Sequence, residues 1–404
     1  VAPPVAPPVA PTELLQFAAV RLFVERARAQ LPGFQLTSQN TAAVVRICQR
    51  LDGIPLALEL AAARVSGLSV EEIAQRLDDR FRLLTTGSRT ALPRQQTLRA
   101  LIDWSYDLLA DAERALFRRL AVFAGGWTLE AAEAVCAGPS PSPPSLAETG
   151  DEEAGRDDIL DLQTRLIAKS LVIAETSAGA MRDRMLETIR DYARAKSAAQ
   201  EIEQTSARHY DYFVALAERA EPELRGKFLI AWHKRLETDH DNLRAALRWA
   251  LSQPDANLAL RLSGALHEFW MFRNHAAEGQ SWYEMALARS DGPCQPLYLA
   301  KAYSGAGSMA WMQGNPAQAH QLHTQALHYF EQANDKNGMA SSLHNLGTQR
   351  WHQGDWEDAE DLATRALRMA NEAGDDWLKA NILNGLGVIW GARGNDGQAL
   401  LYYA

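Results

Sequence analysis

The segment Gly314-Asn315-Pro316-Ala317-Gln318-Ala319 joins a Gly-Asn turn signal to a small residue, and this pattern recurs along the chain. Gly354-Asp355 with Ala359 follows 40 residues later, and Gly394-Asn395 with Ala399 after a further 40. Gly-Asn and Gly-Asp favour a tight turn, and small residues at fixed positions let two helices approach closely. The segment therefore predicts a helical hairpin that is repeated every 40 residues.

The repeat extends backwards from this segment. Gly307, Gly347 and Gly387 keep the same interval, as do Ala286, Ala326 and Ala366 in a series that begins in a degenerate copy. Such units stack into a solenoid with a concave face. We expect repeats of the longer tetratricopeptide type over residues 259–404, and further helical sequence after Ala404, which falls inside the second helix of a copy.

The composition is that of a globular protein. Of its 404 residues 47% are hydrophobic and 23% charged, the net charge is −9, and the three cysteines are widely spaced. The acidic balance argues against a general affinity for nucleic acid or anionic membranes, and no apolar stretch is long enough for a transmembrane helix. Isolated thiols suit a reducing compartment, so we expect a cytoplasmic protein.

Residues 1–11 repeat an Ala-Pro-Pro-Val pattern, which predicts an extended linker. Residues 12–84 read as a helical domain, with helices over 12–29, from Thr37 or Ser38 to Leu51, from Pro55 to about Val65, and after Ser69. At the corner between the second and third of these, Gly53 accepts the left-handed backbone of a helix end, and Pro55 begins a helix without losing a hydrogen bond.

Residues 85–203 form a second block of helices that ends in a small β-hairpin. We expect a loop over 85–97, helices over 98–109, 111–122 and 128–136, a disordered insertion over 138–156, a helix over 159–169, and strands over 171–175 and 181–186. Helices followed by a hairpin outline a winged-helix domain. A helical connector over 204–258 then leads to the repeats, so the predicted fold class is mainly α with a terminal α-solenoid.

Several segments together resemble one family. Gly53-Ile54-Pro55-Leu56 is similar to the Gly-Leu-Pro-Leu motif of the STAND nucleotide-switch ATPases, which include NB-ARC proteins and bacterial ATPase and LuxR-type transcriptional regulators. Asp103–Leu109 and Leu120–Gly126 resemble winged-helix segments of that family, and Leu236–Leu247 resembles a helix junction that precedes its repeats. The resemblance implies a regulator in which the helical and winged-helix domains close over nucleotide on an ATPase domain.

The resemblance also implies nucleotide contacts. The motif proline packs on adenine in that family, which points to Pro55 with its neighbours Gly53 and Leu56; the plainer alternative is an ordinary helix corner. Residues 184–193 resemble the Met-His-Asp motif, whose histidine contacts the phosphate of ADP. Leu186 stands in the histidine position and Glu187 in the aspartate position, and a leucine cannot donate that hydrogen bond, so a strand end running into a helix is the alternative.

The chain lacks a phosphate-cradling loop, because only Gly226-Lys227 pairs glycine with lysine and its flanking residues break the pattern. Gly305-Ala306-Gly307 imitates a dinucleotide fingerprint but belongs to the repeat. We therefore expect no enzyme activity and no cofactor of this chain alone, and ADP or ATP only in a longer parent with an upstream ATPase domain.

Histidines cluster in the repeats. His320, His323 and His328 share one predicted helix. They could bind zinc, but the helix offers no cysteine or acidic residue before Glu331 to complete the ligand set, which favours a solvated polar face. His320, His323, His344 and Trp351 are the candidates for contact with a partner on the concave surface.

An arginine run precedes the winged helix, at positions 76, 80, 82, 89, 94 and 99. It permits phosphate contacts with DNA, although aspartates interleave with it. The predicted function is the regulatory and protein-interaction part of a nucleotide-switch transcriptional regulator, sensing a protein or small-molecule effector through its repeats. The alternatives are a plain tetratricopeptide scaffold with degenerate switch domains, and DNA binding by the winged helix.

Overall fold

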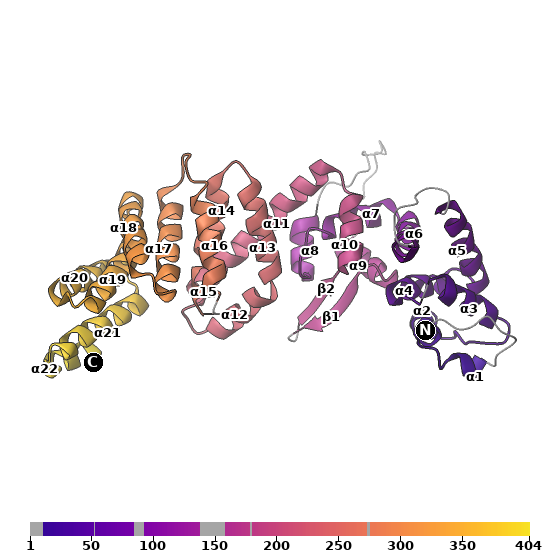
Figure 1. The fold of residues 1–404 in the computed structure, drawn as a ribbon, viewed down its shortest axis with the longest axis horizontal. Helices are drawn as coiled ribbons and strands as arrows, with labels where there is room; N and C mark the ends of the chain where they lie inside the picture. The colour runs from indigo at the N-terminus through magenta and orange to yellow at the C-terminus, as the bar shows by residue number, and fades with distance from the viewer. Residues whose placement is uncertain (1–10, 52, 85–92, 138–157, 178–179, 273–274) are drawn as a thin grey trace, which may run out of the picture. The chain divides into compact units, whose positions relative to one another are not determined.

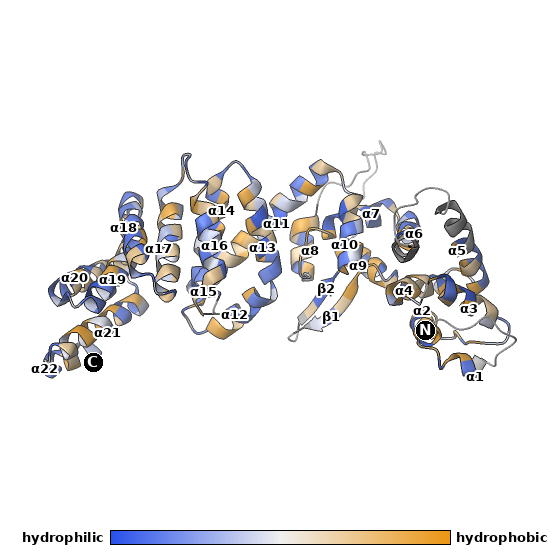
Figure 2. Ribbon diagram, in the orientation of Figure 1, coloured by the Kyte–Doolittle hydropathy of each residue, from blue (hydrophilic) through white to orange (hydrophobic). Residues whose placement is uncertain are grey.

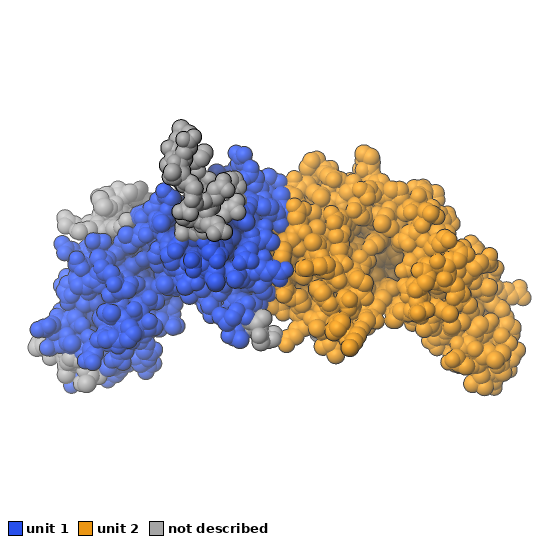
Figure 3. Space-filling view, turned by 180° about the vertical axis from the view of Figure 1, so that it is seen from behind, with its two compact units in different colours: residues 1–208 blue, residues 209–404 orange. Residues whose placement is uncertain are grey.

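The computed structural model describes residues 11–51, 53–84, 93–137, 158–177, 180–272 and 275–404. The linker at 1–10, Asp52, most of the expected 85–97 loop and the insertion at 138–156 lie outside these residues. The described chain forms two compact units, residues 1–208 and 209–404 (Figure 3). The finer division into linker, two domains, connector and repeats stays a prediction.

Unit 1 begins with short helices (Figure 1). Their bounds are α1 Pro11–Leu14, α2 Ala18–Gln30, α3 Thr41–Arg50, α4 Pro55–Ala62, the 3₁₀ helix Ala63–Ser66, and α5 Val70–Leu84. Helix α4 packs against α2 and α6 and buries Leu58 and Leu60 completely. The apolar run after Pro55 is thus the centre of this block.

The predicted corner between α3 and α4 is confirmed. Gly53 has a φ of 65°, its N–H donates to the Cys48 carbonyl at 3.1 Å, and Pro55 occupies the first turn of α4. At the start of α5, the Ser69 N–H donates to Glu72 Oε2 at 2.8 Å while the Ser69 hydroxyl accepts from the Glu72 N–H at 3.2 Å. Both helix starts follow from local sequence.

Three expected helix boundaries are wrong. The helix expected over 12–29 is broken, because the Gln16 and Phe17 N–H groups bond three residues back and turn the chain before Ala18. Helix α3 begins at Thr41, since Thr37 and Asn40 bond to each other in a preceding turn. Residues 93–97 belong to α6, which starts at a proline, as helices readily do.

The rest of unit 1 surrounds a two-stranded sheet. Its elements are α6 Pro93–Asp107, α7 Asp111–Leu120, α8 Leu129–Cys136, α9 Ile159–Ala168, β1 Ile173–Ser177, β2 Ala180–Arg184 and α10 Glu187–Ala195. The strands pair antiparallel, with Ile173 opposite Arg184. Trp127, 1% exposed, exchanges two backbone hydrogen bonds with Asp183 of β2 at 2.8 and 2.9 Å. This bridge anchors the hairpin to the turn before α8.

Helix α11 (Ala199–Glu223) begins in unit 1 and ends in unit 2, and helices alone follow within the described residues. They are α12 Leu229–Thr238, α13 His240–Ser252, α14 Ala256–Ala265, α15 His267–Phe272, α16 Ala276–Leu287, α17 Pro296–Met312, α18 Pro316–Ala333, α19 Lys336–His352, α20 Trp356–Ala373, α21 Asp376–Ala392 and α22 Asp396–Tyr403. The mainly helical fold is therefore confirmed.

The last six helices form three successive hairpins, α17–α18, α19–α20 and α21–α22 (Figure 1). Gly314, Gly354 and Gly394 turn each hairpin with φ values of 74°, 81° and 74°. The repeat helices carry both hydrophobic and hydrophilic residues (Figure 2), and their hydrophobic residues include the fully buried Ala326 and Ala366. The period of 40 residues therefore corresponds to one hairpin of the solenoid.

Close helix approach explains the repeated glycines. A Cβ at Gly307 would lie 2.9 Å from the buried ring of His323, and one at Gly387 would lie 2.5 Å from the ring of Tyr403. The repeat therefore needs glycine at these positions. Within the described residues, no helix combines the length and apolar character needed to cross a bilayer.

Candidate ligand-binding cleft in the helical repeats

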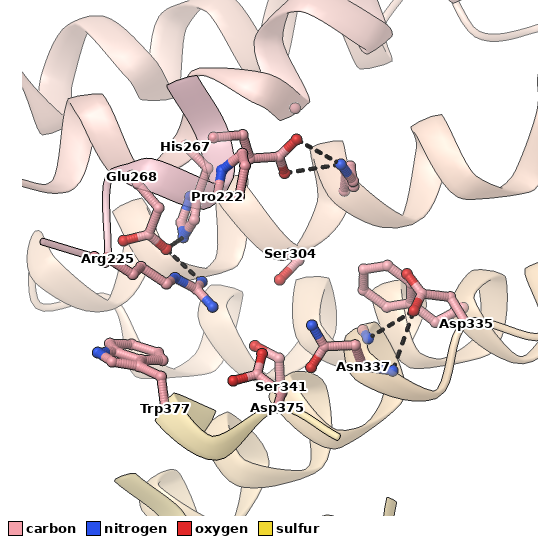
Figure 4. A pocket seen from close by; sticks show the side chains of 16 residues that line it. Pro222, Arg225, His267, Glu268, Ser304, Asp335, Asn337, Ser341, Asp375 and Trp377 are labelled. Atoms are coloured by element: carbon pink, nitrogen blue, oxygen red, sulfur yellow. Dashed lines mark hydrogen bonds and ion pairs between the residues drawn. The ribbon is translucent and has the colours of Figure 1, made fainter. Parts of the chain in front are cut away.

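A cavity of about 590 Å³ opens within unit 2 and is called the repeat cleft here (Figure 4). Its walls come from the end of α11, from α14, α15 and α17, and from the starts of α19 and α21. The lining residues are Glu221, Pro222, Arg225, Gly226, Gly264, His267, Glu268, Lys301, Ser304, Phe330, Asp335, Asn337, Gly338, Ser341, Asp375 and Trp377. Segments remote in sequence thus share one concave site.

Two glycines shape the wall. A Cβ at Gly338 would lie 2.2 Å from the Phe330 ring, and one at Gly264 would lie 3.0 Å from the Lys301 side chain. The Phe330 ring therefore occupies space that any larger residue at 338 would need. Glycine at both positions lets neighbouring helices pack closely behind the cleft.

Ion pairs fix the two cations of the cleft. The Arg225 guanidinium donates to Glu268 Oε1 at 2.5 Å and stacks over Trp377, its Cζ lying 4.3 Å from the ring centroid. Lys301 Nζ donates to both carboxylate oxygens of Glu221, at 2.8 and 2.9 Å. These pairs join helices from different parts of unit 2 and order the side chains that face the cavity.

The titrating groups of the cleft are perturbed by burial and by one another. Burial lowers the pKa of His267, which keeps its ring neutral near pH 7 although Glu268 lies 3.9 Å away. Burial also acts to raise the pKa of Glu268, but the charge that His267 carries when protonated and the charge and hydrogen bond of Arg225 act against it, so the pKa is lowered. Glu268 is therefore a stable anion on the cleft wall.

The charges of the cleft do not balance. The lining includes four carboxylates, and two of them, Asp335 and Asp375, also cap helices by accepting backbone N–H bonds at 2.8–3.2 Å. Arg225 and Lys301 supply two positive charges, which leaves a net charge of −2 with His267 neutral. Trp377, 43% exposed, adds an aromatic face. A ligand with a cationic group beside an apolar one matches this lining.

Two of the predicted partner residues, His344 and Trp351, line a second cavity of about 240 Å³ in α19 and α21. Burial lowers the pKa of His344. His320 instead lies against Gln349, with Nδ1 3.3 Å from Oε1. Partner contact by these residues stays a prediction.

His323 differs most from expectation. Its exposed fraction is 1%, and burial lowers its pKa to about 3. The solvated face expected for the histidines of this helix is therefore wrong at this position. The ring faces Gly307 inside the hairpin, because that glycine leaves room for it.

The residues tied to nucleotide by resemblance all lie in unit 1. Pro55 is exposed at the start of α4, with Gly53 and Leu56 half-buried beside it. Leu186 is the half-buried residue before α10, and the exposed Glu187 lies 3.6 Å from Arg190. The roles of these residues stay predictions.

The arginine run is only partly visible. Arg76 and Arg99 are exposed, whereas the side chains of Arg80, Arg82, Arg89 and Arg94 lie outside the described residues. On the hairpin, Arg182 is buried and donates to the Gly126 carbonyl at 3.1 Å, and Arg184 pairs with Glu175 at 2.6 Å. The hairpin arginines are therefore engaged within the protein.

Sequence reasoning missed the cleft, although the repeat held a signal for it. Asp335 and Asp375 occupy equivalent positions 40 residues apart, and so do Asn337 and Trp377. All four line the cleft, because equivalent positions of stacked hairpins face the same side. Arg225 gave no comparable signal, since it lies before the repeats.

Comparisons with known proteins agree with this architecture. Residues 338–404 match the family model described as "Tetratricopeptide repeat". The helical hairpins within residues 338–404 are tetratricopeptide repeats. A protein of Mycobacterium tuberculosis named "Putative HTH-type transcriptional regulator" is 46% identical over 273 residues, which is 67% of this chain and 29% of that protein. The chain thus spans less than a third of this relative.

Two further similarities are more limited. An uncharacterized protein of M. tuberculosis is 42% identical over 178 residues, covering 44% of this chain and 42% of its own length. Among solved structures, a STAND protein with a tetratricopeptide repeat sensor from Pyrococcus horikoshii aligns over 96% of this chain and 58% of its own. That alignment has 14% identity and a TM-score of 0.38, too low to support an argument.

Proposed function

We propose that this chain is the regulatory and protein-interaction part of a transcriptional regulator of the nucleotide-switch class, and that the repeat cleft receives its effector. The relatives named as HTH-type regulators support the regulatory role, and the tetratricopeptide repeats support the interaction role. The observation that carries the proposal is the cleft itself, where ordered ion pairs surround a cavity of about 590 Å³.

The effector is a peptide segment with a basic side chain next to an apolar one. Its cation meets the excess carboxylates, and its apolar part lies against Trp377. The Arg225 guanidinium lies over the Trp377 indole, with Cζ 4.3 Å from the ring centroid, so the ring has an ordering contact before the ligand arrives. A preformed aromatic face lowers the entropy cost of binding.

The nucleotide part of the proposal rests on the family resemblance. In the longer parent, an ATPase domain in the same polypeptide would bind ADP or ATP, with Pro55 against adenine and the segment at Leu186 and Glu187 near phosphate. The chain described here does not hydrolyse nucleotide itself. Effector binding at the cleft changes the closed–open balance only if its affinity differs between the two states.

The experiment is a binding survey with the purified 404-residue chain. Peptides that differ only in charge and in one aromatic residue are titrated by calorimetry. Basic, aromatic peptides should bind, and acidic ones should not. Trp377→Ala should weaken binding about tenfold, whereas Phe228→Ala, which changes an exposed ring outside the cleft lining, should not. Equal binding by both variants and the wild type would refute the cleft as the effector site.

A further inference from the structure

A group of histidine and carboxylate side chains lies apart from the repeat cleft, near the ends of three helices of unit 2. Glu237 lies near the end of α12, His240 is the first residue of α13, and His275 directly precedes α16. Each offers one ligand atom, and the three atoms lie within 4.8 Å of one another. Three helices thus bring two imidazoles and one carboxylate to a single point.

The spacing matches a metal coordination sphere. His275 Nε2 lies 3.4 Å from Glu237 Oε2, and the rings of His240 and His275 are 4.8 Å apart between centroids. In a tetrahedral zinc site with bonds of about 2.0–2.1 Å, neighbouring ligand atoms are about 3.4 Å apart. One edge of the tetrahedron is therefore already at the required length, and the ligand atom of His240 lies within 4.8 Å of the other two.

His240 supplies an independent indication of a ligand. The residue is 6% exposed, and its Nε2 atom has no hydrogen-bond partner among the described residues. A buried polar atom without a partner is costly, and a bound cation would satisfy it.

Glu278 is a further acidic residue beside the cluster. Glu278 Oε1 lies 3.4 Å from His240 Nε2, within the distance of an ion pair with a protonated ring but without the geometry of a hydrogen bond. Two bonds from Arg244, at 2.7 and 2.6 Å, and one from Trp282, at 3.1 Å, hold this carboxylate in place. Arg244 balances the charge of Glu278, so this carboxylate orders the surroundings of His240 without being one of the three ligands.

We propose that Glu237, His240 and His275 bind a divalent transition-metal ion, for which Zn²⁺ is the matching probe. Two imidazoles and one carboxylate leave a fourth position for water. The ion would tie the end of α12 to the starts of α13 and α16. Its role is to stabilise the helices that precede the repeats.

The test uses the untagged 404-residue chain after treatment with a chelator. Zn²⁺ is titrated by calorimetry in competition with a chromophoric chelator, and metal content is measured after dialysis. The wild type should bind one equivalent and melt at a higher temperature with Zn²⁺ than without. Co²⁺ should give the intense visible absorption of a tetrahedral site.

Two variants avoid the fully buried His240, whose replacement could unfold the chain. Glu237→Gln and His275→Gln alter partly exposed side chains and should each weaken Zn²⁺ binding at least about tenfold. His328→Gln changes an exposed histidine outside the cluster and should leave the affinity unchanged. Far-ultraviolet circular dichroism establishes that each variant is folded.

Two results would overturn the proposal. One is a wild type that binds Zn²⁺ no better than the Glu237→Gln/His275→Gln double variant. The other is a melting temperature that rises equally with Zn²⁺ in both proteins. Either would mean that the cluster is held together by ring packing and the Glu237–His275 contact alone.

Discussion

The guanidinium of Arg225 lies over the indole of Trp377, with its Cζ 4.3 Å from the ring centroid, while it donates to Glu268 at 2.5 Å. One residue thus connects an ion pair on α15 to an aromatic face on α21. Arginine suits both contacts because its guanidinium is planar and always charged. A mutation can therefore remove the contact of Arg225 with Trp377 while a positive charge stays near Glu268.

Arg225→Lys keeps a positive charge near Glu268 but removes the planar stack. We expect a several-fold loss of affinity for basic, aromatic peptides, and a loss of unfolding free energy of no more than about 1 kcal/mol. Calorimetry and urea unfolding measure the two effects. Arg261→Lys is the matched control, since Arg261 pairs with Glu218 at 2.6 Å outside the cleft lining. A similar loss of affinity in both variants would contradict the role of the stack.

Gly307→Ala tests the close approach within the first hairpin. The added Cβ would lie 2.9 Å from the buried His323 ring, and such overpacking outweighs the gain in helix propensity. We expect the unfolding free energy to fall by about 1–2 kcal/mol, measured by urea denaturation. Gly391→Ala, whose Cβ would meet its nearest atom at 3.9 Å, should be neutral or stabilising. A stable Gly307→Ala would mean that the ring moves aside freely.

Pro55→Ala tests the adenine contact in a longer protein that includes an ATPase domain. The proline ring is exposed at the first turn of α4, where it is available to a ligand. We expect less ADP to remain bound after purification, as measured by chromatography of the released nucleotide. Pro296→Ala removes a proline from the same position of α17 and should have no effect. Unchanged ADP content in both variants would leave the corner a purely structural feature.

Asp183 predicts a specific pH dependence of stability. Burial raises its pKa from 3.8 to about 6, and Gln163 donates a hydrogen bond to its carboxylate. The folded chain therefore holds this proton more tightly than the unfolded chain. The resulting stabilisation is complete below the ordinary pKa and is lost as the pH rises through 6.

Asp183→Asn should remove this contribution. We expect the unfolding free energy of Asp183→Asn to fall less between pH of about 4 and about 6 than that of the wild type, as measured by urea unfolding at several pH values. Asp291→Asn, at an exposed turn, should follow the wild-type curve. If the difference in unfolding free energy between the wild type and Asp183→Asn does not change with pH, the Asp183 carboxylate has the same pKa in the folded and unfolded chains, and the prediction is wrong.

Local sequence signals predicted the helical turns well. Gly53 before Pro55 and the series from Gly314 to Gly394 require backbone conformations that few other residues adopt, so their meaning does not depend on distant parts of the chain. The start of α2 was missed because hydrophobic periodicity continued through Leu15, where backbone bonding turns the chain. Periodicity reports the buried face more reliably than the helix end.

The candidate sites were much less predictable. The cleft needs Arg225 beside Trp377, and the proposed metal site needs Glu237 beside His275; in both cases the partners come from helices that only the folded chain brings together. His323 illustrates the same limit, because a histidine on a polar helix gives no sign that a distant glycine will make room for it. Sequence spacing finds repeated units, whereas these contacts depend on how the units stack.

The equivalence of Asn337 and Trp377 also bears on how the binding wall can be altered. In each case an aspartate two residues earlier caps the helix, and a left-handed residue, Asn334 or Gly374, precedes that aspartate. The left-handed residue and the aspartate thus specify the turn and the helix start, whereas Asn337 or Trp377 supplies the side chain that lines the cleft. Substitution of Asn337 or Trp377 alone therefore offers a route to new recognition chemistry in which the hairpin keeps its shape.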